Sequence, residues 1–424
     1  MIRHDVADAL RDSPGDYLHP DYAGYSFAGV TATAAAVLGV DVGRTLPADV
    51  FAGVDTDVRN VVVLLVDGFG FGRFADFAEV HPFLDAVASE GTVTPLTSIY
   101  PSETAAALTT LHTATLPVEH GLIGWDLYLD EADLVVESLP FRTKDGRDPR
   151  EVADCDLGGG ALLATDPVYP TLRDGGVAPT AIQPTETVTG VYSRRALAGA
   201  QQLGYRNLPD AALKLRQRLE ADDGDDRRYF YAYVPHVDGA AHRAGTDSDQ
   251  YRAQLLAVCD AFRRELASNL DPGVAEETLL LLTADHGLLD TDPDEEIDLL
   301  ELDVVAENLR RDADGDPVPP VGSARNVHLH LQEGAAAAVR DALAARLDAR
   351  VFTRAEAVEA GLFGDADPTP RFRRRCGDVV LSHRDRQVWY DDPERRPFVG
   401  VHGGLSPSEM LVPFAAVHLA DLRE

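Results

Sequence analysis

Residues 60–67 read NVVVLLVD, an uninterrupted run rich in valine and leucine that ends in an acid. A strand with this composition is buried on both faces, as is typical of parallel sheets covered by helices on either side. The sequence GFGFG follows at once and predicts a loop. Asp67 should therefore lie at the carboxyl end of a buried parallel strand, where open α/β sheets bind their ligands.

Two later apolar runs end in the same way. Residues 229–234 lead into PHVDGAAH, and residues 278–282 lead into TADHG. Helical patterns occupy residues 211–220 and 248–267 beside these runs. This alternation predicts an α/β fold built on a doubly wound sheet, with the chemically active residues gathered at one edge.

A fourth segment begins at Thr104 and reads TAAALTTLHTATL up to Pro117. It contains strong helix formers, and Pro101 and Ser102 just before it supply a start signal. Thr104 is therefore expected near the N-terminus of a helix, where free backbone N–H groups attract anions.

The remainder divides the chain. Residues 291–392 combine an acidic, proline-containing stretch with the strand-like NVHLHL, an alanine-rich helix and the strand-like VVLSH. We expect them to form a small inserted α+β cap lobe, while residues 1–290 and 393–424 form the catalytic core. Residues 127–201 are a second irregular stretch.

The 424 residues carry a formal net charge of −33, although 45% hydrophobic and 26% charged residues are ordinary values that exclude a disordered or fibrous chain. All basic residues except Lys144 and Lys214 are arginine. Concentrated salt screens the repulsion within such an acidic surface. The charge therefore favours a cytoplasmic protein of a halophile over an acidic protein of a mesophile. The charge also argues against binding a nucleic-acid polymer.

The sequence shows neither an apolar leader segment near residue 1 nor 18 consecutive apolar residues, so neither a secretion signal nor a membrane span is expected. Three cysteines, Cys155, Cys259 and Cys376, are far apart. They indicate a reducing compartment without a disulfide framework, consistent with the cytoplasm. The oligomeric state is left open.

Acids and imidazoles recur in these motifs in a number that suits two divalent cations. The candidate ligands are Asp67, Asp238, His242, Asp285, His286 and His402. Oxygen and imidazole donors without thiolate suit zinc, manganese or iron, and the three histidines favour two zinc ions, with manganese as the alternative. Each fragment alone also has a structural explanation, such as an acid that caps a loop.

The ordered set of motifs resembles the type I phosphodiesterase/nucleotide pyrophosphatase family of the alkaline phosphatase superfamily. LLVDGFG resembles the first metal-aspartate loop, YPSETAAALTTLHTATLPVEHGLIGW the nucleophile helix, and VPHVDGAAH, LLTADHG and VHGGLSPSEMLVPF the later metal motifs. The resemblance covers most of the chain. It implies the alkaline-phosphatase-like mixed sheet and a phosphoric ester hydrolase.

The resemblance also implies roles for individual residues. Thr104 would be the nucleophile and a ligand of the second metal together with Asp67, Asp285 and His286, while Asp238, His242 and His402 would hold the first metal. The expected reaction is hydrolysis of a small-molecule phosphodiester or nucleotide through a covalent threonine intermediate.

Some positions depart from the family or leave alternatives open. The family's glycine ten residues after the threonine is Ala114, and the asparagine that often follows the threonine by three is Ala107. Ser102 is a competing nucleophile. Phe69 and Phe71 would either pack under the loop or stack on a leaving group, and packing is favoured.

The choice between a monoester and a diester turns on positive charge near the nucleophile. Residues 91–119 contain no Lys or Arg, which favours a diester or pyrophosphate, although Arg325 from the cap lobe could supply a cation. The alternatives are a phosphomonoesterase or phosphonoacetate hydrolase of the same fold and, outside enzymes, a metal-binding interaction module.

Overall fold

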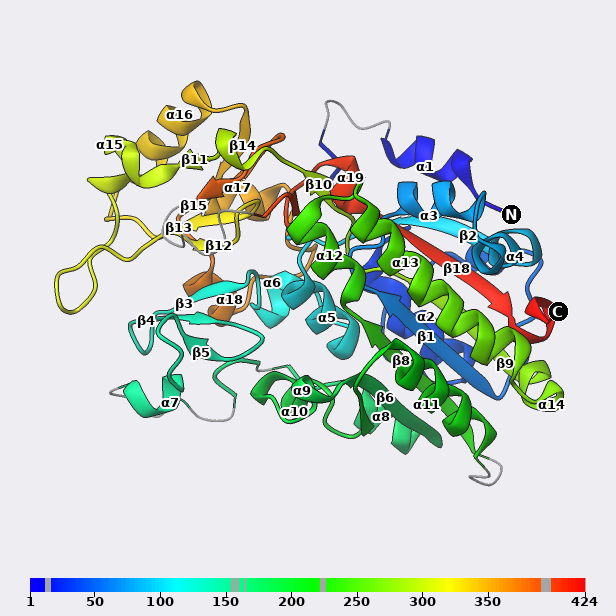
Figure 1. The fold of residues 1–424 in the computed structure, drawn as a ribbon. Coiled ribbons are helices and arrows are strands. Elements are labelled where there is room, and N and C mark those ends of the chain that lie inside the picture. The colour runs from blue at the N-terminus through cyan, green and yellow to red at the C-terminus, as the bar shows by residue number, and fades with distance from the viewer. Residues whose placement is uncertain are drawn as a thin grey trace.

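The computed structural model describes residues 1–11, 17–153, 157, 160–163, 165–221, 226–389 and 398–423. The sequence-predicted α/β architecture is confirmed, with a seven-stranded mixed sheet at its centre (Figure 1). The strands follow one another across this sheet in the order β2 (Thr92–Thr97), β18 (Leu411–His418), β9 (Thr278–Thr283), β1 (Asn60–Val66), β8 (Arg227–Val234), β6 (Val177–Pro184) and β7 (Gln201–Tyr205).

The strands from β9 to β7 run parallel, and β18 pairs antiparallel with both β9 and β2. All seven residues of β1 are buried, because the strand lies in the middle of the sheet with helices over both faces. The apolar run of residues 60–66 is therefore the centre of the core, as its composition predicted.

Helices cover both faces of this sheet (Figure 1). One face carries α3 (Phe71–Ala78), α4 (Pro82–Glu90), α11 (Leu208–Glu220), α12 (His236–Ala244) and α13 (Asp249–Phe262). The opposite face carries α2 (Val30–Val37), α5 (Thr104–Thr113) and α8 (Tyr169–Asp174). The predicted helix from Thr104 is thus present, and Thr104 is its first residue.

A second seven-stranded sheet is antiparallel and lies beside the carboxyl ends of the central strands (Figure 1). Its strands follow in the order β14 (Ala349–Thr353), β15 (Val379–His383), β13 (Val327–Leu329), β12 (Val321–Gly322), β3 (Asp126–Leu129), β4 (Leu134–Glu137) and β5 (Arg142–Thr143). Four of these strands come from the expected insertion, and β3 to β5 come from the irregular stretch before it.

The lobe around this second sheet is therefore built from two segments of the chain, of which only the later one was expected from the sequence. The boundaries proposed at residues 291 and 392 stay a prediction, and the latter lies in residues 390–397, outside the described part. We call the structure around the second sheet the small lobe.

Two further expectations concern cysteines and membrane spans. Cys259 and Cys376 are buried and free, whereas Cys155 lies outside the described residues. Among the described residues, no helix combines the length and apolar character that crossing a bilayer requires.

Candidate metal centre

Three neighbouring strands bring the candidate ligands together. Strands β8, β1 and β9 pair in parallel, with Val66 opposite Val234 and Leu65 opposite Thr283. The segments that follow these residues therefore leave the sheet at the same edge. Asp67 follows β1, Asp285 follows β9, and α12 with Asp238 follows β8.

The group expected to hold the second metal is compact. Nε2 of His286 lies 3.4 Å from Oδ1 of Asp67 and 3.5 Å from Oδ2 of Asp285. Oγ1 of Thr104 lies 3.1 Å from the same nitrogen. The donor atoms of Asp67, Asp285 and His286 lie within 4.8 Å of one another, so one cation fits between them.

The group expected to hold the first metal is adjacent. Nε2 of His242 lies 3.1 Å from Oδ2 of Asp238, one helical turn away on α12, and Nε2 of His402 lies 3.8 Å from Oδ1 of Asp238. The compact triad here is Asp238, His286 and His402, with His286 in place of the expected His242. The ring of His402 stacks on that of His286 with centroids 3.7 Å apart, so the two groups share a wall.

Each of the three imidazoles is oriented by a backbone carbonyl. Nδ1 of His242 lies 2.7 Å from the Gly400 oxygen, Nδ1 of His286 lies 2.9 Å from the Gly287 oxygen, and Nδ1 of His402 lies 3.2 Å from the Ser102 oxygen. A carbonyl only accepts hydrogen bonds, so Nδ1 carries the proton in each ring. The lone pair on Nε2 is then free to face the cluster, as metal-binding histidines require.

The carboxylates show the clearest sign that a cation belongs here. Oδ1 of Asp67, Oδ1 of Asp238 and Oδ2 of Asp285 are buried and accept no hydrogen bond from any residue that the structure describes. Buried charged oxygens are costly unless they are paired or bind a metal. Three such oxygens from three acids, close to the Nε2 atoms of the histidines, fit the expected pair of divalent cations.

The pKa values of these groups reflect the same crowding. Burial raises the pKa of Asp67 well above its usual range, and the charges of Asp285 and Asp238 raise it further. Burial also raises the pKa of Asp285, although His286 opposes the change. Burial, followed by the neighbouring His286, lowers the pKa of His402 well below its usual value. Without a cation, the cluster disfavours the charged form of all three groups.

The hydroxyl groups of Thr104 and Ser102 differ in their surroundings. Thr104 faces the cluster from the first turn of α5, whereas the Ser102 hydroxyl is fully buried and donates to the Gly404 carbonyl at 2.7 Å. This geometry supports Thr104 as the nucleophile, which stays a prediction. Ala114 follows α5 as its C-cap with φ of 52°, so the family's glycine position keeps the left-handed conformation that glycine adopts most easily.

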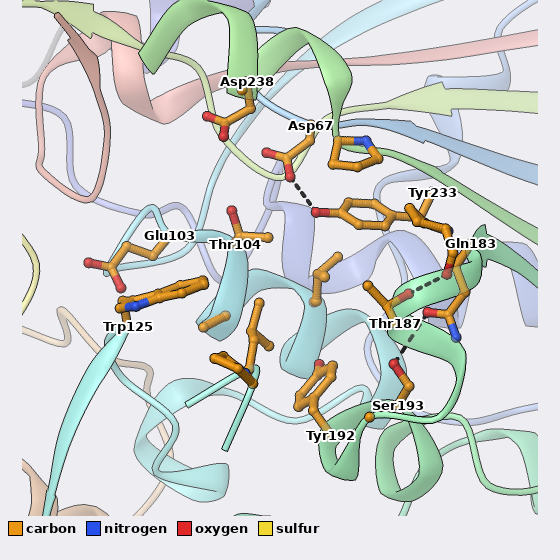
Figure 2. A pocket seen from close by; sticks show the side chains of 18 of the residues that line it. Asp67, Glu103, Thr104, Trp125, Gln183, Thr187, Tyr192, Ser193, Tyr233 and Asp238 are labelled. Atoms are coloured by element: carbon orange, nitrogen blue, oxygen red, sulfur yellow. Dashed lines mark hydrogen bonds between the residues drawn. The ribbon is translucent and has the colours of Figure 1, made fainter. Parts of the chain in front are cut away.

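A cavity of about 790 Å³ opens beside the cluster. Figure 2 shows Thr104 beneath Asp67 and Asp238, with Trp125 and Glu103 on one side and Tyr233 and several polar side chains on the other. Besides Trp125 and Tyr233, the lining includes Tyr192, Gln183, Thr187 and Ser193. The site therefore combines a metal-ligating end with a wide, partly aromatic chamber.

Several cavity residues were not identified from the sequence. The Tyr233 hydroxyl donates to Oδ2 of Asp67 at 2.5 Å and so orients a candidate metal ligand. Alternation along β8 was the available signal, because Tyr231 and Tyr233 are two residues apart on one face of the strand and both line the cavity. For Trp125, Gln183 and Tyr192 the sequence offered no comparable pattern.

Two other sequence expectations are resolved by the structure. Arg325 does not reach the cavity: it is fully buried, and it donates to both carboxylate oxygens of Glu409 at 3.1 and 2.9 Å. Phe69 and Phe71 are buried in the core, which confirms that they pack under the loop.

Comparisons with solved structures support the fold. Murine ectonucleotide pyrophosphatase/phosphodiesterase 5, as an inactive threonine-to-alanine variant in complex with AMP, is 16% identical with a TM-score of 0.60, covering 84% of this chain and 87% of its own. The human protein is 15% identical with a TM-score of 0.58 and the same coverage. Phosphonoacetate hydrolase from Sinorhizobium meliloti 1021, in complex with phosphonoacetate, is 16% identical with a TM-score of 0.61, covering 86% and 94% of the two chains.

No curated protein sequence gives a significant match. The family model for type I phosphodiesterase/nucleotide pyrophosphatase, in contrast, matches residues 61–405. That span includes every candidate ligand from Asp67 to His402 and most of both lobes. The chain therefore belongs to the type I phosphodiesterase/nucleotide pyrophosphatase family.

Proposed function

We propose that this protein hydrolyses phosphodiester or pyrophosphate bonds of small molecules, nucleotides among them, through a covalent intermediate on Thr104 at a two-cation site. The observation that carries the proposal is the position of the Thr104 hydroxyl. It lies 3.1 Å from Nε2 of His286, among three buried acids with unpaired oxygens, and it lines the 790 Å³ cavity. A nucleophile, a cation site and room for substrate therefore coincide.

The candidate ligands would divide between the two cations. Asp67, Asp285, His286 and Thr104 would hold one, and Asp238, His242 and His402 the other. Two bound divalent cations would acidify the nucleophile and neutralise charge on the phosphoryl oxygens. We favour zinc because three imidazoles contribute, with manganese as the alternative.

The chain's own residues supply the nucleophile and part of the oxyanion stabilisation. Oγ1 of Thr104 would attack phosphorus and displace the leaving oxygen, which forms a phosphothreonine or nucleotidylthreonine ester. Water then cleaves this ester and restores the hydroxyl. Thr104 begins α5, whose first N–H groups have no partner within the helix, so they and the helix dipole favour a phosphoryl group at this place.

The cavity favours a substrate with a large organic group. Trp125, Tyr192 and Tyr233 offer flat surfaces for a ring, and Gln183 offers a side-chain amide. AMP binding by the murine relative agrees with a nucleotide substrate for this chain as well. These features support a diester or pyrophosphate that carries a base or another ring.

Phosphonoacetate hydrolysis is the second candidate, because the bacterial enzyme shares the fold with a TM-score of 0.61. A substrate this small and highly charged calls for several cationic side chains. Among the described residues that line the cavity, Arg142 is the one Lys or Arg, and it pairs with Glu137. Phosphonoacetate and phosphomonoesters are therefore less suited to this cavity than a diester.

The cellular setting belongs to the same proposal. A net charge of −33 suits a cytoplasm rich in salt, where counterions screen the carboxylates. A role as a metal-binding interaction module would be favoured by a missing ligand, and all seven predicted positions carry suitable side chains. We therefore propose an enzyme of a halophile's cytoplasm.

The test compares three substrates in concentrated KCl with added zinc or manganese: bis(p-nitrophenyl) phosphate, p-nitrophenyl phosphate and phosphonoacetate. We expect the highest kcat/KM for the diester and loss of turnover on chelation. A higher kcat/KM for the monoester or for phosphonoacetate would transfer the assignment to that reaction. Equal rates with and without metal would contradict the two-cation site.

A further inference from the structure

A second hollow lies on the small lobe and contrasts with the charge of the molecule. Its volume is about 660 Å³, and it shares no lining residue with the catalytic cavity. Five of its lining residues are arginines, in a chain whose net charge is −33. We call it the arginine hollow and define it by Arg310, Arg311, Arg354, Arg373 and Arg374.

Three separate segments supply these side chains. Arg310 and Arg311 lie on a segment that pairs with the residues just after β13, where the Arg310 N–H donates to the His330 carbonyl at 2.9 Å. Arg354 is the first residue of α17 (Arg354–Glu359), and Arg373 and Arg374 lie in the last turn of α18 (Pro370–Arg375). Distant parts of the chain thus direct positive charge to one place.

Nearby acids compensate only part of this charge. Asp130 lies 2.6 Å from Arg310, Asp378 lies 2.7 Å from Arg354, and Glu131 lies 3.7 Å from Arg374. Glu333 also lines the hollow, so four acids stand against five arginines.

Arg311 and Arg373 have no acidic partner among the described residues. Arg311 donates to the Gly315 carbonyl and Arg373 to the Pro368 carbonyl, each at 3.3 Å. Two guanidinium groups at the hollow are therefore free to pair with an anion.

A buried imidazole at the hollow supplies an independent sign of a ligand. His330 is 2% exposed, and its Nε2 makes no hydrogen bond to any residue that the structure describes. Its ring lies 5.0 Å from the ring of Tyr128, over which Arg310 is placed at 5.6 Å. Buried polar atoms are rarely left without a partner, and His330 is one of the residues that line the hollow, so its unpaired nitrogen supports a polar ligand at this place.

The buried surroundings of His330 keep its imidazole ring uncharged. Burial lowers the pKa of this ring to about 3, and the charges of Arg354 and then Arg310 contribute in the same direction. The ring is thus neutral at ordinary pH and suited to a hydroxyl or a protonated oxygen, while the guanidinium groups suit charged oxygens.

We propose that the arginine hollow is a second binding site, separate from the catalytic cavity, for a small molecule that bears two or more phosphoryl groups. Guanidinium forks match phosphate oxygens in paired hydrogen bonds, and several forks around one hollow suit a ligand with several anionic groups. Strand β3 links the two sites, because Trp125 before it lines the catalytic cavity and Asp130 after it lines the hollow.

The test is calorimetric titration of the metal-loaded protein with methylenediphosphonate, whose P–C–P bridge resists hydrolysis. We expect Arg311→Gln with Arg373→Gln to remove one bound anion per chain, or to weaken it at least tenfold. Diester hydrolysis measured without the anion should change less than twofold. Arg173→Gln with Arg346→Gln is the matched control, because it removes the same charge from exposed positions outside the hollow.

The outcomes separate the possibilities. Unchanged stoichiometry and affinity in the hollow variant would overturn the proposal. An equal loss in the control would also overturn it, because the effect would then be one of general charge. Any anion bound at the catalytic site adds equally to all three proteins, so failure of the proposed enzymatic function leaves the comparison intact.

Discussion

Two buried charged clusters lie close together in this molecule and are built in opposite ways. Glu409 accepts hydrogen bonds from Arg325, Gly404 and Ser406, and Arg325 in turn also donates to two backbone carbonyls. In the candidate metal centre, Asp67, Asp238 and Asp285 each leave one buried oxygen without a described partner.

The difference separates structural charge from functional charge. A buried ion that only supports the fold is enclosed by complementary groups, because an unpaired charge in the interior costs several kcal/mol. The candidate metal centre, which we call the open cluster, has carboxylate oxygens without hydrogen-bond partners, so it is destabilising unless a cation binds. The satisfied pair therefore supports the fold, and the cluster with unpaired oxygens is the proposed reactive site.

The largest expected effect tests whether the open cluster is catalytic. Thr104→Ala should lower kcat for the diester by roughly 10⁴-fold, because it removes the attacking oxygen. Folding and metal content should change little, as measured by thermal unfolding and by metal analysis.

Ser102→Ala is the matched control, since the Ser102 hydroxyl is already engaged with the Gly404 carbonyl. It should keep kcat within about tenfold and cost about 1 kcal/mol of stability. The reverse result would move the nucleophile to Ser102.

The satisfied pair should respond in stability and not in metal content. Glu409→Gln should lower the free energy of unfolding by roughly 3–5 kcal/mol, because it leaves Arg325 as a buried charge without a counterion. Urea unfolding in constant KCl measures the change.

Asp365→Asn removes an acid from the exposed pair with Arg44, so it should cost less than about 1 kcal/mol. If the two substitutions had equal effects, the pair between Arg325 and Glu409 would not be the scaffold element that its geometry indicates.

In the open cluster, unlike the satisfied pair, the effect of a substitution on stability should depend on whether metal is bound. Asp67→Asn should stabilise the metal-free protein by roughly 1–3 kcal/mol, because it removes one of three crowded buried charges. With metal present, the same substitution should destabilise the protein, because a ligand is lost. Unfolding of both proteins with and without a chelator measures this change of sign, and equal effects in the two conditions would argue against a cation.

The contrast between the two clusters also shows what the sequence can reveal. Asp67 and Asp285 were predictable as neighbours, because each follows an apolar run and parallel strands end at one edge. The partner of Arg325 was not predictable, because Glu409 is 84 residues away and no local sequence pattern indicates the contact. Long-range pairing likewise placed β3 to β5 in the second sheet, although residues 127–201 show no strong strand pattern.

Hydrogen bonding at the site was equally invisible in the sequence. Whether a carboxylate oxygen is paired depends on side-chain orientation, which residue type and spacing do not determine. Strand alternation on β8 would have placed Tyr231 and Tyr233 on one face, but it cannot say which hydroxyl reaches an acid.

The smallest expected effect concerns Tyr233 and Tyr231, of which only the first bonds to an acid of the cluster through its hydroxyl. Tyr233→Phe removes the donor to Oδ2 of Asp67 and so leaves both oxygens of this ligand without orientation. Metal affinity should fall by roughly tenfold, with a similar decrease in kcat at limiting metal that added metal restores. Tyr231→Phe is the control, because the Tyr231 hydroxyl bonds to no described residue although the side chain lines the same cavity. Metal titration of both variants distinguishes the two cases. Equal metal affinities would show that Asp67 needs no orienting partner. A loss of affinity confined to Tyr233→Phe would show that the surrounding chain orients the carboxylates of the open cluster before the cations bind.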